Sequence, residues 1–107
     1  KREEYVELFK KLAHDLGADT GSSAPWLVAR ASYVPDLPEE KMRAIREAQT
    51  EIWKSGLALR GPDTDDLGGD MRHSRDHIHF SRTGLEAHAA RWYAHVWSQL
   101  FADPVGR

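Results

Sequence analysis

The stretch WLVARAS, residues 26–32, decides how this chain folds. It opens on four consecutive apolar residues, Trp26 to Ala29, and the run is too short for a typical helix. A short, almost continuous apolar run is typical of a strand that is buried on both faces, as the strands of parallel sheets are. We therefore expect a strand here, covered by helices from the neighbouring parts of the chain.

Two amphipathic helices are predicted further out, near the two ends of the chain. Residues 4–16 carry apolar side chains at helical spacing, and Gly17 follows as a stop signal. Residues 85–100 show a second apolar stripe. Its members are Leu85, His88, Ala89, Trp92, Val96 and Leu100. Both segments are expected to bury one face against the rest of the fold.

A third helix is predicted to start within DLPEE, residues 36–40. Asp36 can cap this helix, Glu39 completes a capping box, and Pro38 suits the first turn. Its apolar face consists of Met42, Ile45, Gln49, Ile52 and Trp53. A glycine then ends the helix, and LALR, residues 57–60, follows as a second, shorter strand.

The order of these elements predicts an α/β fold with a parallel sheet. Helix, strand, helix, strand, loop and helix follow one another, and strands that alternate with helices pair in parallel. Two strands do not make a doubly wound sheet, because such strands need neighbours and helices on both faces. We therefore expect residues 1–107 to be the C-terminal segment of one larger α/β domain. Its N-terminal part, or a second chain, is expected to pair with the first strand.

Composition excludes several classes of function. The formal net charge is −2, so the chain lacks the basic footprint of a nucleic-acid-binding protein. No apolar run approaches the roughly 20 residues of a membrane span. There are no cysteines, which excludes disulfides and thiolate metal ligands but does not indicate a compartment.

The sequence DHIHF, residues 76–80, is the candidate for chemistry. The loop that contains it, residues 61–80, follows the second strand and so lies at the edge of the sheet where α/β proteins bind ligands. Asp76 precedes His79 by three residues, and its carboxylate can fold back onto the imidazole Nδ1. That contact fixes the tautomer and leaves Nε2 to accept a proton from a nucleophile. The alternative is that Asp76 and His79 only cap the start of the following helix and are otherwise solvated.

The segment GPDTDDLGGDMRHSRDHIHFSRTGLEAHAARWYAHVW, residues 61–97, resembles the last block of the SGNH/GDSL hydrolases. It is most similar to the carbohydrate acetylesterases, which include sialate O-acetylesterases and the acetylxylan esterases of carbohydrate esterase family six. The matching positions are Asp76, His79, Phe80, Ser81 and Gly84. With the strand WLVARAS, the likeness covers about residues 26–100.

This resemblance implies the C-terminal half of a flavodoxin-like, three-layer α/β/α domain. It implies a serine esterase that removes O-acetyl groups from a carbohydrate and needs no cofactor. Asp76 would be the orienting acid and His79 the general base of a Ser-His-Asp triad.

The nucleophile of that triad is not identified in this chain. In the family the serine lies early, in a strand-to-helix turn, and the oxyanion donors follow in later blocks. Gly21, Ser22 and Ser23 precede a strand and are expected in a plain loop at the opposite edge of the sheet. Ser32 ends a strand on the correct edge but enters YVPDLP, so a structural or substrate-lining role is expected. The nucleophile is therefore expected from another segment.

Two further functions remain open on the residues alone. One is a non-catalytic carbohydrate-binding or interaction module on the same fold. The other is a zinc or iron site, because imidazole and carboxylate suit both metals. Its candidate ligands are His73, Asp76, His77 and His79.

The remaining polar and aromatic candidates are expected to be structural. His77 is expected to point away from the pair, and His88 and His95 to pack or snorkel on the last helix. Trp92, Tyr93 and Trp97 are expected in the core, and the alternative for them is a sugar-binding platform. Three loop carboxylates are expected either to line a pocket rim or to cap the backbone of their own loop. They are Asp63, Asp65 and Asp66.

Overall fold

The computed structural model of the chain describes residues 1–102. Its regular elements are α1 (Arg2–Thr20), β1 (Leu27–Arg30), α2 (Glu39–Lys54), β2 (Leu59–Asp63), the 3-10 turn η1 (Gly69–Met71), α3 (Arg82–Val96) and the π-helical turn η2 (Trp97–Phe101). None of the described helices is long and apolar enough to cross a bilayer.

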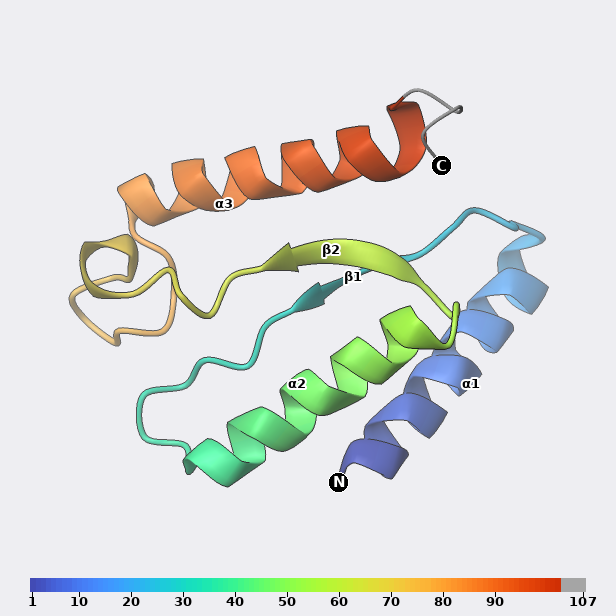
Figure 1. The fold of residues 1–107 in the computed structure, drawn as a ribbon, viewed down its shortest axis with the longest axis horizontal. Coiled ribbons are helices and arrows are strands. Elements are labelled where there is room, and N and C mark those ends of the chain that lie inside the picture. The colour runs from blue at the N-terminus through green and yellow to red at the C-terminus, as the bar shows by residue number, and fades with distance from the viewer. Residues whose placement is uncertain (103–107) are drawn as a thin grey trace.

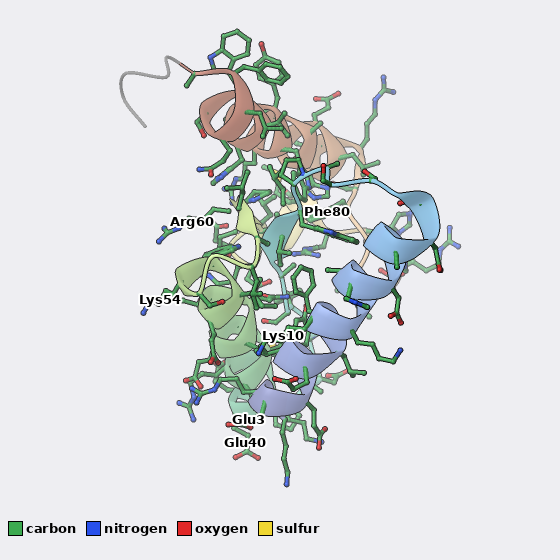
Figure 2. All side chains as sticks on the ribbon, turned by 90° about the vertical axis from the view of Figure 1, so that its right-hand side faces the viewer. Glu3, Lys10, Glu40, Lys54, Arg60 and Phe80 are labelled. Atoms are coloured by element: carbon green, nitrogen blue, oxygen red, sulfur yellow. The ribbon has the colours of Figure 1, made fainter. Side chains whose placement is uncertain are left out.

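The elements form three layers. Helices α1 and α2 lie side by side on one face of the strands, and α3 lies on the other face (Figures 1 and 2). Strands β1 and β2 pair in parallel, with Leu27 opposite Leu59 and Val28 opposite Arg60. The predicted α/β class and the predicted parallel pairing are confirmed.

The main core lies between α1, α2 and the strands. Its buried members are Val6, Ala48, Ile52 and Ala58, and the side chains packed against them are Tyr5, Phe9, Trp26, Val28 and Leu57. On the opposite face, Trp92 of α3 lies directly over Gly61 of β2. A Cβ atom at Gly61 would stand 2.9 Å from the Trp92 ring. The absence of a side chain at this position therefore sets how closely α3 approaches the sheet.

Two predicted element ends were wrong. Gly17 does not stop the first helix, because α1 continues to Thr20 and ends at Gly21, whose φ of 69° lies in the left-handed region. The second strand is Leu59–Asp63 rather than 57–60. The reason is local, since the N–H of Leu57 still donates to the carbonyl of Ile52 and so prolongs the end of α2.

The predicted capping box of α2 is also wrong. The N-cap is Pro38, and no side chain caps this helix end. Asp36 lies two residues too early, in a turn closed by the bond from the N–H of Leu37 to the carbonyl of Val34. Glu39 is the first residue of the helix instead of its third.

Within residues 1–102, the sheet has an open edge and α1 has an exposed apolar stripe. The sheet has two strands, so β1 has a partner on one edge only. Helix α1 also exposes a stripe made of Leu8, Leu12 and Leu16. An unpaired strand edge and an exposed apolar stripe are both features that favour pairing with another segment.

Candidate active site at the carboxyl ends of the strands

Asp76 and His79 are in direct contact. The Oδ2 atom of Asp76 lies 2.6 Å from the Nδ1 atom of His79. The other carboxylate oxygen, Oδ1, accepts the N–H of Ile78 at 2.9 Å and the N–H of His79 at 3.1 Å. One carboxylate therefore fixes both the imidazole ring and the backbone that carries it, and the predicted contact is confirmed.

The backbone of the loop brings the pair together. Both strands point toward the loop of residues 64–81, which places the pair at the carboxyl ends of the sheet, as predicted (Figure 1). His77 adopts a φ of 60°, and its N–H donates to the carbonyl of His73 at 2.8 Å. The N–H of His73 in turn donates to the carbonyl of His79 at 2.6 Å, which closes the base of the loop.

Asp76 is held in its ionised form. The N–H of Ile78 and the side chain of His79 keep the pKa of the Asp76 carboxyl well below its usual range. An ionised carboxylate on Nδ1 favours the tautomer with hydrogen on Nδ1, which leaves Nε2 of His79 as the acceptor. The His79 side chain is 81% exposed, and no described residue bonds to Nε2. The ring can therefore accept a proton from a group that is brought to it.

The residues that follow the pair are structural. Ser81 caps α3 with its hydroxyl, which accepts the N–H of Gly84 at 3.1 Å and donates to the carbonyl of Asp70 at 2.6 Å. The ring of Phe80 packs on His88 with 4.6 Å between centroids. These contacts attach the loop of residues 64–81, which carries Asp76 and His79 and is called the loop of the pair below, to the start of α3.

No family model, curated protein or solved structure matches this chain. What the chain does is therefore inferred from its own residues.

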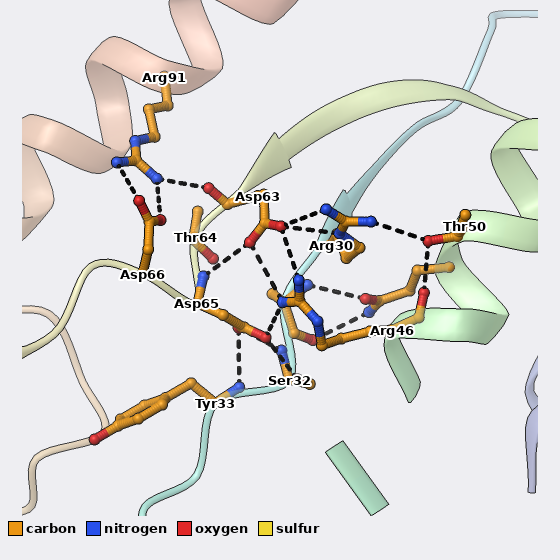
Figure 3. Close-up of polar contacts among 12 residues, drawn as sticks. Arg30, Ser32, Tyr33, Arg46, Thr50, Asp63, Thr64, Asp65, Asp66 and Arg91 are labelled. Atoms are coloured by element: carbon orange, nitrogen blue, oxygen red, sulfur yellow. Dashed lines mark hydrogen bonds and ion pairs between the residues drawn. The ribbon is translucent and has the colours of Figure 1, made fainter. Parts of the chain in front are cut away.

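A second polar cluster lies beside the loop, at the end of β2 (Figure 3). The Asp65 carboxylate accepts the N–H of Ser32 at 2.7 Å, the Ser32 hydroxyl at 2.6 Å and the N–H of Tyr33 at 3.0 Å. Asp63 forms ion pairs with Arg30 at 2.8 Å and with Arg46 at 3.1 Å. The cluster joins the segment after β1 to the segment after β2.

These contacts settle the roles expected for the loop carboxylates. Asp63 accepts the N–H of Asp65 at 3.1 Å, so the predicted capping of the loop's own backbone is confirmed there. Asp66 pairs with Arg91 of α3 and so holds that helix to the loop. Ser32 is buried with its hydroxyl on Asp65, which fits the structural role expected for it.

The charges of this cluster are mutually stabilised. Burial alone would raise the pKa of the Asp65 carboxyl, but hydrogen bonds from Ser32, Arg46 and Tyr33 outweigh burial and hold it below its usual range. The pKa of Asp63 is lowered in the same way by Arg46 and Arg30. Both carboxylates are therefore ionised near neutral pH and bound to their partners.

The histidines do not gather into a metal site. Within residues 1–102, no group of three or more His, Asp or Glu side chains has the arrangement to hold a metal ion. The metal hypothesis therefore lacks the ligand set that it needs. His88 packs as expected, with its Nε2 atom accepting the Trp92 Nε1–H at 2.9 Å.

Two other expectations concern residues far from the pair. Gly21, Ser22 and Ser23 lie in the loop before β1, at the opposite end of the sheet from His79, as expected (Figure 1). Tyr93 and Trp97 were expected in the core, and this was wrong. They form an exposed row with Phe101, with centroid distances of 6.4 Å and 5.9 Å along the row.

Sequence reasoning missed one residue of the site, Arg72. It is buried beneath the loop of the pair and bonds to three backbone carbonyls. No spacing or neighbouring motif marks this arginine in the sequence, because an arginine in a polar loop is most often solvated.

Proposed function

We propose that this chain supplies the acid and the base of an SGNH-type serine esterase that deacetylates O-acetylated carbohydrate. The observation that carries the proposal is the contact of Asp76 with His79 Nδ1, with Nε2 of His79 open to solvent. It occurs at the carboxyl ends of parallel strands, where α/β proteins place their sites. The motif's resemblance to the carbohydrate acetylesterases supplies the substrate class.

The proposed reaction has two steps. In the first, a serine hydroxyl from another segment attacks the acetyl carbonyl and gives its proton to Nε2 of His79. Asp76 stabilises the resulting imidazolium, which then protonates the departing sugar oxygen. In the second step, His79 takes a proton from water as the water attacks the acyl-enzyme, and acetate leaves with regeneration of the serine hydroxyl.

We propose further that the chain forms the C-terminal half of a flavodoxin-like domain. The arrangement of helices on both faces of a parallel sheet supports this proposal. In that arrangement β1 would be an inner strand, and its open edge and the leucine stripe of α1 would be covered by the N-terminal part of the domain. A second copy of this chain is the alternative occupant.

We expect the isolated chain to associate through the open side of the sheet. Gel filtration at tens of micromolar should give a mass above the 12.2 kDa of one chain. Leu12→Lys, in the middle of the exposed stripe, should shift the chain toward the monomer because it charges that surface. A monomeric wild-type chain with a cooperative thermal melt would show that the core closes by itself and would overturn the half-domain proposal.

The function is tested by comparing this chain with the complete protein that carries the serine block. The isolated chain is expected to show no turnover of p-nitrophenyl acetate above that of its His79→Ala variant. The complete protein should release acetate from acetylated xylan, and the same substitution should abolish the release. Turnover by the isolated chain that depends on His79 would place a nucleophile within these residues and contradict the proposal.

The exposed row of Tyr93, Trp97 and Phe101 favours a second candidate, a non-catalytic carbohydrate-binding module. Aromatic faces on a surface are suited to stacking on sugar rings or on a protein partner. Binding of acetylated xylan by the complete protein without release of acetate, unchanged by Asp76→Asn, would favour this candidate over the esterase.

A further inference from the structure

Arg72 is a buried cation whose guanidinium is bonded to backbone carbonyls. The residue is 8% exposed, and among residues 1–102 no carboxylate forms an ion pair with it. Instead, its guanidinium donates to the carbonyls of Leu67 at 2.6 Å, Ile78 at 2.7 Å and Thr64 at 3.0 Å. Burying a charge is costly unless the charge is well bonded, and here the three carbonyls supply those bonds.

Two aromatic rings complete the surroundings of the guanidinium. Its central carbon lies 4.2 Å from the ring centroid of Phe80 and 4.8 Å from that of Tyr33. Both distances are within the range of cation–π attraction. Tyr33 follows β1, whereas Phe80 ends the loop of the pair, so Arg72 joins both segments at this edge of the sheet.

The contact with Ile78 leads directly to the Asp76–His79 pair. The carbonyl of Ile78 and the N–H of His79 belong to one planar peptide unit. Arg72 holds the oxygen of this unit at 2.7 Å, and Asp76 accepts its N–H at 3.1 Å. The peptide that enters His79 is therefore fixed at both of its polar ends.

We infer that Arg72 is a positioning residue that holds the Ile78–His79 peptide so that Asp76 stays bonded to His79. The consequence for catalysis rests on the proposed function, but the positioning itself does not. This positioning requires the planar guanidinium group with its several N–H donors, because a lysine ammonium cannot reach three carbonyls in fixed directions.

A purely structural role predicts a different outcome. The bond from His73 to His79 and the bridge between Arg72 and Phe80 are backbone contacts, so they keep the base of the loop closed without the arginine side chain. If Arg72 only filled space, a substitution that left the chain folded would leave the pair unchanged. If Arg72 positions the peptide, the pair loosens while the fold persists.

The test is NMR on the full chain with labelled histidine and aspartate. In the wild type we expect a downfield His79 Nδ1–H resonance, from the bond to Asp76, and an Asp76 carboxyl that titrates well below pH 3.8. In Arg72→Met the resonance should be lost, and the Asp76 midpoint should rise by about one pH unit or more, because both backbone donors loosen. Because the pKa of Asp76 is lowered in the wild type, the bond between Asp76 and His79 should persist to a lower pH in the wild type than in Arg72→Met.

The matched control is Arg75→Met, which removes the same charge from an exposed position in the same loop. It should leave both signals unchanged. Arg72→Lys keeps the buried charge and serves if Arg72→Met does not fold, and it should show the same loss in smaller degree. An unchanged resonance and an unchanged Asp76 titration in either folded variant would overturn the inference. Absence of esterase activity in the complete protein would instead overturn the proposed function and leave this inference standing.

Discussion

The Asp76→Asn variant of the complete protein is expected to lose about 10⁴-fold in kcat/KM for an acetyl ester, which is the loss known for the orienting acid of a Ser-His-Asp triad. An asparagine keeps the shape of the side chain and removes its charge. Its amide then donates to Nδ1 of His79, which places the ring hydrogen on Nε2. A ring in that tautomer cannot accept the proton of the serine that the proposed reaction requires.

The control for this prediction lies next to the pair. His77→Asn removes an exposed imidazole without removing a contact of Asp76 or His79, and asparagine tolerates the φ of 60° at this position. It should keep kcat/KM within a few fold of the wild type. A loss of less than tenfold in Asp76→Asn, or an equal loss in His77→Asn, would mean that the pair does not act as the acid and base.

The contact of the pair was predictable because it is local. Asp76 and His79 are three residues apart, and their meeting requires only one turn of the chain. The bonds of Asp65 to Ser32 span 33 positions along the sequence and depend on the register of β1 against β2. A polar pair at that separation leaves no periodic signal, so the cluster became visible only in the folded chain.

The fold was predictable where apolar residues are continuous and less so where glycine and proline intervene. The parallel pairing follows from the run at β1. The second strand was placed too early because Gly61 and Pro62 are typical of a loop. Proline is tolerated there because, within residues 1–102, β2 pairs with β1 on one edge only, and an edge strand can leave a proline unpaired.

The last helix shows a limit of helical periodicity. Its sequence contains two apolar stripes, one with His88 and Trp92 and one with Tyr93 and Trp97. Spacing alone does not say which stripe faces the sheet. Gly61 determines which stripe faces the sheet. Because Gly61 has no side chain, Trp92 can pack at a place where an added Cβ atom would lie 2.9 Å from its ring. The stripe with Tyr93 and Trp97 is consequently exposed.

The largest effect on stability is expected at Gly84, in the first turn of α3. A Cβ atom at this position would lie 1.9 Å from the carbonyl oxygen of Met71 and 2.8 Å from its carbonyl carbon. Both are backbone atoms, so no side-chain rotation relieves the clash. The same oxygen accepts the N–H of Ser81 at 2.9 Å, which ties η1 to the helix cap. Gly84→Ala should therefore lower the free energy of unfolding by about 3 kcal/mol, the upper range for overpacking, despite the better helix propensity of alanine.

Gly68→Ala is the matched control for this substitution. Gly68 is extended, with a φ of −110°, and nothing lies within 4 Å of an added Cβ. Alanine there should be neutral or stabilise by up to about 1 kcal/mol, because it restricts the unfolded chain. Urea denaturation followed by circular dichroism measures both variants. A Gly84→Ala midpoint equal to that of Gly68→Ala would mean that α3 does not pack on η1 this closely. The loop that carries Asp76 and His79 would then lack the rigid support that the proposed chemistry requires, because that loop is anchored to α3 through Ser81 and Gly84.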